Sequence, residues 1–192
     1  MPDPANDKAT KRSRFVNNRF TLGDHPRSEA SAALARRLLA APELAAAGVV
    51  CAYQALGAEP DPGALLDHLA ARGVRVLLPI LLPDGDLDWA ERAGDLVRGR
   101  LGLLEPAGPR LGPAMVGRAD CVLLPALAVS AAGARLGRGG GSYDRALART
   151  PAPVWTCALV YDHELDADFP VEPHDQPVRA ACSPSRLVRF RD

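Results

Sequence analysis

The sequence has no long apolar run and no excess of charge of either sign. Its 23 Lys and Arg residues balance 23 Asp and Glu residues, so the chain lacks the broad basic surface of a general nucleic-acid binder. Its longest apolar run, 74–82, contains Arg75 and Pro79 and falls short of the roughly 18 apolar residues that cross a bilayer. We therefore expect neither a membrane protein nor a nucleic-acid binder, and any anion site must be local.

The sequence has few cysteines, and their placement excludes a metal site built from closely spaced Cys and His ligands. No CxxC motif and no Cys/His pair at metal-ligand spacing occurs, and most of the cysteines stand in apolar runs, where they usually act as small buried hydrophobes. The four are Cys51, Cys121, Cys157 and Cys182. The first fourteen residues hold no apolar segment of a secretory signal, which predicts a cytoplasmic protein.

Length and pattern predict one α/β domain over residues 1–192. A chain of 192 residues with 47% hydrophobic content can bury one good core. Strands are expected at 48–53, 74–82, 121–124 and 154–160, and helices at 28–41, 64–72 and 143–149. This alternation predicts a three-layer α/β/α sandwich with a mainly parallel, Rossmann-like sheet.

Three local features complete the expected outline. Asp61 followed by Pro62 is typical of a helix N-cap and first helical residue. The segment 83–113 is rich in Gly, Pro and charge, with a short strand near 87–89, and we expect it to cross the ligand-binding edge of the sheet. Its Asp84, Asp86 and Asp88 resemble the start of a calcium loop but lack the required later residues, which favours a solvated turn. Residues 1–27 are a candidate mobile segment.

The stretch 135–145, RLGRGGGSYDR, joins an expected strand to an expected helix and has the composition of a phosphate-binding loop. Glycines 139, 140 and 141 allow positive φ and close approach, so that successive N–H groups can point at phosphate oxygens. Arg135 and Arg138 supply forks that pair with phosphate, and Asp144 could orient Mg²⁺. The alternative is a flexible turn with solvated arginines and with Asp144 at a helix start. Neither a GxxxxGK[ST] loop nor a GxGxxG fingerprint is present.

The segment VLLPALAVSAAGARLGRGGGSYDRAL resembles the motif of the 5-formyltetrahydrofolate cyclo-ligase family, also called methenyltetrahydrofolate synthetases. Further similarity lies in YQALGAEPD (53–61), RGVRVLLP (72–79), LGLLEP (101–106) and EPHD (172–175). The resemblance implies that ATP and Mg²⁺ are used to convert 5-formyltetrahydrofolate, a reduced folate, into 5,10-methenyltetrahydrofolate. In that route the formyl oxygen takes the γ-phosphoryl group, ADP leaves, N10 closes the ring and phosphate departs.

The same resemblance implies roles for individual residues. Carried over by position, the ATP-binding residues are Lys8, Arg12, Arg135, Gly137, Arg138, Gly139, Gly140, Gly141, Tyr143 and Asp144. Arg138 and Tyr143 are the implied catalytic residues, Asp144 the implied Mg²⁺ ligand, and Tyr53, Glu59 and Glu105 the implied folate-binding residues. Lys8, Arg12 and Arg19 share one face of an early helix, which could close over phosphates or simply be solvated. From the residues alone, an exposed loop carboxylate is the favoured reading of Glu59.

The sequence departs from the family pattern at two positions, where Ser130 replaces an Asp and Ser142 a Tyr. Ser142 would also suit a helix N-cap. These changes leave open a family member that binds folate or nucleotide without efficient ring closure, and an isomerase of sugar phosphates on a similar sheet is a third reading.

His174 and Asp175 are expected to be structural near the site, and His163 to be a solvated loop residue. We expect a monomer or weak homodimer.

Overall fold

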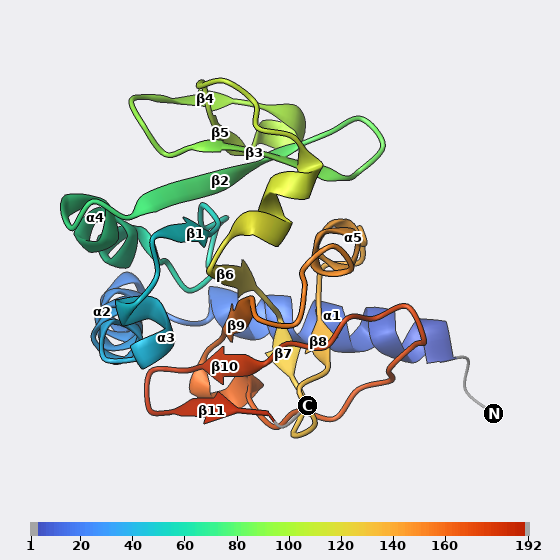
Figure 1. Ribbon diagram of the computed structural model, residues 1–192. Coiled ribbons are helices and arrows are strands. Elements are labelled where there is room, and N and C mark those ends of the chain that lie inside the picture. The colour runs from blue at the N-terminus through green and yellow to red at the C-terminus, as the bar shows by residue number, and fades with distance from the viewer. Residues whose placement is uncertain (1–3, 191–192) are drawn as a thin grey trace.

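A seven-stranded sheet forms the centre of the molecule (Figure 1), in the computed structural model, which describes residues 4–190. Residues 1–3 and 191–192, at the ends of the expected domain, lie outside the described residues. The sheet order is β11-β10-β9-β6-β1-β2-β3. The strands are β1 Val49–Cys51, β2 Arg75–Leu81, β3 Leu87–Glu91, β6 Cys121–Pro125, β9 Trp155–Leu159, β10 Ala180–Cys182 and β11 Leu187–Arg189.

Strand direction confirms a mainly parallel sheet. β2, β1, β6, β9 and β10 are mutually parallel, whereas the edge strands β3 and β11 pair antiparallel with β2 and β10. Numbered among themselves in chain order, the parallel strands lie in the order 2-1-3-4-5. The direction of winding therefore reverses between β1 and β6, and in open α/β sheets this is where a crevice for ligand opens beyond the carboxyl ends of the strands.

Helices cover both faces of the sheet, which confirms the three-layer expectation. α2 (Asp24–Leu39), α3 (Pro42–Ala45) and α4 (Gly63–Ala71) pack on one face, and Figure 1 shows them grouped together. α5 (Ser142–Leu147) and the 3-10 helix η2 (Pro113–Arg118) pack on the other. All four cysteines are buried and free, as small core residues. Within residues 4–190, no helix is long and apolar enough to cross a membrane.

The N-terminal helix α1 (Pro4–Phe20) packs against a small two-stranded sheet, β7 (Ala128–Val129) and β8 (Arg135–Leu136). Phe15 contributes to the small core formed there. Near its end, the buried Arg19 guanidinium donates to both carboxylate oxygens of Glu164, at 2.7 and 2.8 Å. Most of the candidate mobile segment is thus helical, and a buried ion pair ties it to the segment after β9.

The segment 83–113 crosses the ligand-binding side as expected, but of its three clustered aspartates only Asp84 is exposed. After β3 the chain forms a hairpin of β4 (Leu96–Arg98) and β5 (Leu104–Pro106), joined by η1 (Arg100–Gly102). Asp86 and Asp88 are only 8% and 7% exposed. Asp86 pairs with Arg149, and Asp88 accepts hydrogen bonds from the N–H groups of Trp89 and Gly112. The solvated turn is confirmed for Asp84 and wrong for Asp86 and Asp88, because these two carboxylates are buried and satisfy backbone N–H groups and an arginine.

Two predicted helix starts were also displaced. α2 begins at Asp24 rather than at residue 28. Pro62, not Asp61, is the N-cap of α4, although the Asp61 carboxylate still accepts a hydrogen bond from the Gly63 N–H at 2.9 Å. The short strands β10 and β11 were not predicted, because three-residue strands carry too little periodicity to be recognised.

Candidate active site

A pocket of about 460 Å³ opens where the winding of the sheet reverses. Tyr53, just beyond β1, and Pro125 and Ala126, at the end of β6, line it. The glycine loop, α1 and the β4–β5 hairpin supply further walls. Its volume lies within the range of roughly 300–1,000 Å³ typical of small-molecule sites.

The glycine loop adopts the backbone that its composition predicts. Gly139 and Gly141 have φ of 100° and 68°, where side chains are strained. At Gly137, an added Cβ would lie 2.6 Å from Nη1 of Arg135. Ser142 is the first residue of α5, and Gly141 is its N-cap, so the expected Ser142 cap is wrong. Glycine is thus favoured by conformation at two positions, and at a third a side chain would displace a neighbouring guanidinium.

Three cations meet at this loop, and each has a partner. Arg12 Nε donates to the Gly137 carbonyl at 3.0 Å, and Arg135 Nη2 donates to Asp144 Oδ1 at 2.9 Å. Lys8 Nζ donates to Asp175 Oδ2 at 2.7 Å. Arg135 Nε is buried without a hydrogen-bond partner among residues 4–190, so this guanidinium keeps donor capacity in a wall of the pocket. These contacts concentrate positive charge where backbone N–H groups are also available.

Glu59 is buried and faces the loop, so the reading of an exposed loop carboxylate is wrong. Its Oε1 accepts from Arg138 Nε at 2.9 Å, and its Oε2 accepts from the Leu56 N–H at 2.9 Å. Burial, followed by the nearby Glu59 charge, raises the pKa of Tyr53 and of Tyr143 above the ordinary range. Both phenols are therefore neutral hydrogen-bonding groups rather than bases.

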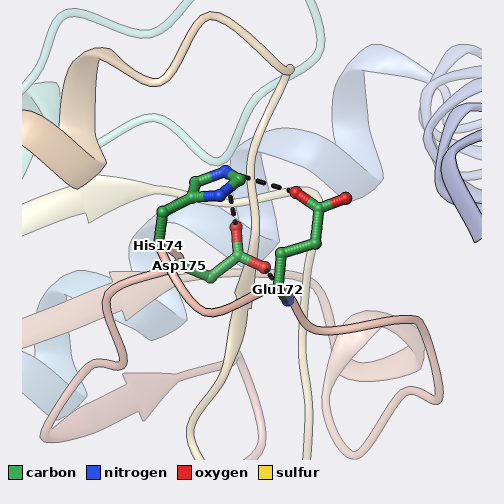
Figure 2. Close-up of side chains that lie close together, drawn as sticks. All are labelled: Glu172, His174 and Asp175. Carbon is green, nitrogen blue, oxygen red and sulfur yellow. Dashed lines mark hydrogen bonds and ion pairs between the residues drawn. The ribbon is translucent and has the colours of Figure 1, made fainter.

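Glu172, His174 and Asp175 form an acidic cluster beside the pocket (Figure 2). Their potential ligand atoms lie within 4.8 Å of one another. Lys8 Nζ lies 2.7 Å from Asp175 and 3.5 Å from Glu172, so an ammonium already neutralises the carboxylates. Burial alone would raise the pKa of Asp175, but hydrogen bonds from Lys8 and from the Glu172 N–H lower it below its ordinary value. The cluster therefore anchors Lys8 in the wall of the pocket.

Most of the implied site residues meet in this one pocket, but Glu105 does not, and neither does Arg19 of the early helix. Glu105 lies on β5 but turns away, and its Oε1 accepts from the Leu81 N–H at 2.9 Å. Arg19 is committed to Glu164 and to the Ala126 carbonyl. This arrangement gives no support to a folate contact of Glu105, and Arg19 is neither at the pocket nor solvated. A charged side chain in a motif looks the same whether it serves a ligand or the backbone.

Ser130, the first departure from the family pattern, is not in the pocket wall. Its Oγ accepts from the N–H groups of Ala132 and Ala134, at 3.3 and 3.1 Å, within the β7–β8 turn. An Asp at this position could make the same local bonds. Ser142, the second departure, does line the pocket.

The apolar wall of the pocket was not predicted. It consists largely of leucines from separate parts of the chain, namely Leu56, Leu81, Leu87, Leu103, Leu104 and Leu127. The exposed Arg98 lies in the same region of the β4–β5 hairpin. The LGLLEP similarity pointed to this hairpin, but nothing local distinguishes a pocket leucine from a core leucine.

Comparison with known proteins identifies one family. The profile of the 5-formyltetrahydrofolate cyclo-ligase family matches residues 4–184. A Mycolicibacterium smegmatis protein named 5-formyltetrahydrofolate cyclo-ligase is 45% identical over 145 residues, covering 72% of this chain and 75% of the relative. An Escherichia coli K12 protein of the same name is 30% identical over 177 residues, covering 88% and 96%.

A solved structure supports the fold. The NMR structure of Aquifex aeolicus 5,10-methenyltetrahydrofolate synthetase superposes with a TM-score of 0.83 at 24% identity, covering 96% of this chain and 93% of that one. A Mycoplasma pneumoniae 5,10-methenyltetrahydrofolate synthetase gives 0.76 at 18% identity, covering 93% and 99%. The sequence matches and this shared architecture lead to one conclusion: the chain belongs to the 5-formyltetrahydrofolate cyclo-ligase family.

Proposed function

We propose that the protein converts 5-formyltetrahydrofolate to 5,10-methenyltetrahydrofolate, with ATP cleaved to ADP and phosphate. The observation that carries this proposal is the pairing of Arg138, from the glycine loop, with Glu59, from the segment after β1. A phosphate-binding element and a buried carboxylate suited to a pterin thus face each other in one pocket. A phosphoryl donor and a folate would therefore be held with their reacting groups together.

The loop end of the pocket suits the triphosphate. Gly139 and Gly141, with positive φ, let backbone N–H groups turn toward phosphate oxygens. Lys8, Arg12 and Arg135 add positive charge, and Arg138 extends from the loop toward Glu59. Phosphoryl transfer depends mainly on positioning and charge neutralisation, which these groups supply without a protein nucleophile.

The part of the pocket lined by Glu59, Tyr53 and the leucines suits a reduced folate. A carboxylate such as Glu59 can accept two hydrogen bonds from the amino-pyrimidinone edge of a pterin. Tyr53 and the leucine wall provide apolar surface for the rings. Once the formyl oxygen has accepted the γ-phosphoryl group, N10 attacks the formyl carbon and the C–O bond to phosphate breaks. The neutral Tyr143 phenol, in the pocket wall, can donate a hydrogen bond to the transferring oxygens.

The residues present fit a magnesium ion. Asp144 and Asp175 both line the pocket, and Asp144 Oδ1 accepts from the Gln176 N–H at 3.3 Å, which holds it against the residue following Asp175. Mg²⁺ prefers oxygen ligands and usually keeps one or two carboxylates beside water and phosphate. When bound here, it would neutralise charge on the phosphates.

The decisive experiment incubates the purified protein with 5-formyltetrahydrofolate and Mg-ATP, and follows methenyl absorbance together with ADP. We expect ATP-dependent product, with ADP released in equal amount. Absence of product at high enzyme concentration would refute the proposal. If folate or ATP then still raised the melting temperature, the protein would be a binding member of the family.

A further inference from the structure

We propose that Arg98 binds the carboxylates of the glutamate tail of the reduced folate and so sets the preference for a glutamylated substrate. The inference deepens the proposed function and rests on it. It concerns the side of the pocket where the β4–β5 hairpin forms the wall.

Arg98 differs from the other lysines and arginines of the pocket in having no partner. Lys8 binds Asp175, Arg12 binds the Gly137 carbonyl, Arg135 binds Asp144 and Arg138 binds Glu59. Within residues 4–190, the Arg98 guanidinium makes no hydrogen bond or ion pair. An unpaired guanidinium keeps its full set of donors for an incoming anion.

The hairpin register directs Arg98 to the pocket. Arg98 on β4 pairs with Leu104 on β5, and residues opposite one another in an antiparallel pair project from the same face. Both residues line the pocket, and both are exposed. Glu105, on the paired strand β5, belongs to the adjacent Val97 pair and bonds to the Leu81 N–H instead. Asp95, the carboxylate nearest in sequence, forms no ion pair with Arg98 among the described residues. Arg98 therefore stands beside apolar surface, at the edge of solvent, without a neutralising neighbour.

This combination matches the far half of a folate molecule. The pterin would lie by Glu59, and the aminobenzoyl ring would follow the leucines, so the glutamate would leave the pocket past the hairpin. Its carboxylates carry negative charge at neutral pH and match a guanidinium fork in geometry. A phosphate group could use the same fork, so the experiment must separate tail binding from nucleotide binding.

The test compares 5-formyltetrahydrofolate with 5-formyltetrahydropteroate, which lacks the glutamate, in the wild type, Arg98→Gln and Arg100→Gln. Arg100 is exposed on the same hairpin but does not line the pocket, and it is the matched control. For Arg98→Gln we expect KM for the glutamylated substrate to rise about fivefold, as for an exposed ion pair. KM for ATP, kcat and KM for the pteroate should not change, and the effect should shrink as salt increases.

Other outcomes overturn the inference. A rise in KM for ATP would assign Arg98 to the nucleotide. Equal rises in KM for the glutamylated folate in Arg98→Gln and Arg100→Gln would mean that the positive charge of the hairpin as a whole, and not Arg98, attracts the substrate. A wild type that used both folates equally well would show that the tail is not bound. If the wild type turned over neither folate, the proposed function would be refuted, whatever the role of Arg98. The role of Arg98 would then be tested by measuring the binding of both ligands by fluorescence. Weaker binding of 5-formyltetrahydrofolate alone in Arg98→Gln would support that role, and equally weaker binding of the pteroate would contradict it.

Discussion

Two arginine–glutamate pairs in this protein have similar N···O distances and opposite settings. Arg19 and Glu164 meet at 2.7 Å, with side chains 2% and 0% exposed. Arg138 and Glu59 meet at 2.9 Å, with side chains 47% and 6% exposed. The first pair joins α1 to the segment after β9, and the second spans an open pocket. Burial therefore separates a pair that holds the fold from one whose arginine can exchange partners with a ligand.

The pair between Lys8 and Asp175 lies between these extremes. Both side chains are nearly buried, at 4% and 9% exposure, yet both residues line the pocket. Such a pair can stabilise the structure and present charge to a ligand at the same time. Substitutions in the three pairs should therefore shift from loss of stability toward loss of activity as exposure increases.

The largest expected effect is on stability, from Arg19→Met. The change leaves the Glu164 carboxylate buried without its guanidinium, which costs about 3–5 kcal/mol of the free energy of unfolding. Urea unfolding followed by circular dichroism measures the loss. Arg186→Gln, which breaks the exposed pair with Asp166, is the control and should cost less than about 1 kcal/mol. Equal losses in the two variants would remove the distinction drawn from burial.

The next effect is on activity, from Arg138→Gln. Loss of charge beside the transferring phosphate should lower kcat/KM for ATP about 10²–10³-fold. Stability should change by less than about 1 kcal/mol, because Arg138 is half exposed and Glu59 keeps its bond from the Leu56 N–H. Steady-state kinetics and urea unfolding are measured together. Arg149→Gln, in an ion pair outside the pocket, should retain ATP use; a comparable kinetic loss there would argue against a specific role for Arg138.

The smallest effect, from Lys8→Met, should depend on pH. The pKa of Asp175 is lowered below its ordinary value of 3.8, so its pairing with Lys8 stabilises the fold fully at pH values above 3.8. This stabilisation is lost as the pH falls through the lowered pKa of the folded state. The variant should lose about 1.5–3 kcal/mol near neutral pH, as for a hydrogen bond to a charged group. The gap to the wild type should close in acid. Urea unfolding midpoints, measured from neutral to acid pH, test this prediction, with Lys11→Met as the control. A stability difference that stayed constant with pH would exclude titration of Asp175 as its cause.

Several features of the site were predictable because they depend on local sequence. Glycine is the residue that tolerates the positive φ found at positions 139 and 141, so a run of glycines between strand and helix indicates a close-approach loop. The alternation of apolar segments with helix-forming ones predicted the parallel sheet, and the family motif added Glu59 and the α1 cations. The Glu59 assignment needed the motif, since a carboxylate before a helix is usually exposed.

Other features depend on contacts between distant parts of the chain. Arg19 continues the spacing of Lys8 and Arg12, but Glu164, 145 residues away, captures it. Glu105 stands in a motif with the pocket hairpin and nevertheless satisfies the Leu81 N–H. No periodicity or local motif shows which partner a charged side chain will find, because that choice follows from the packing of separate elements.

The sequence by itself determined the loop, the strand and helix types and the family, because each depends on backbone preference or on a contiguous motif. Only the tertiary structure decided the strand order 2-1-3-4-5, which brings the ends of β1 and β6 together at the pocket. It alone also separated the buried Arg19 from the available Arg138 and Arg98. The physical reason is desolvation: a charge removed from water must take a fixed partner, whereas one left at the surface can bind a ligand.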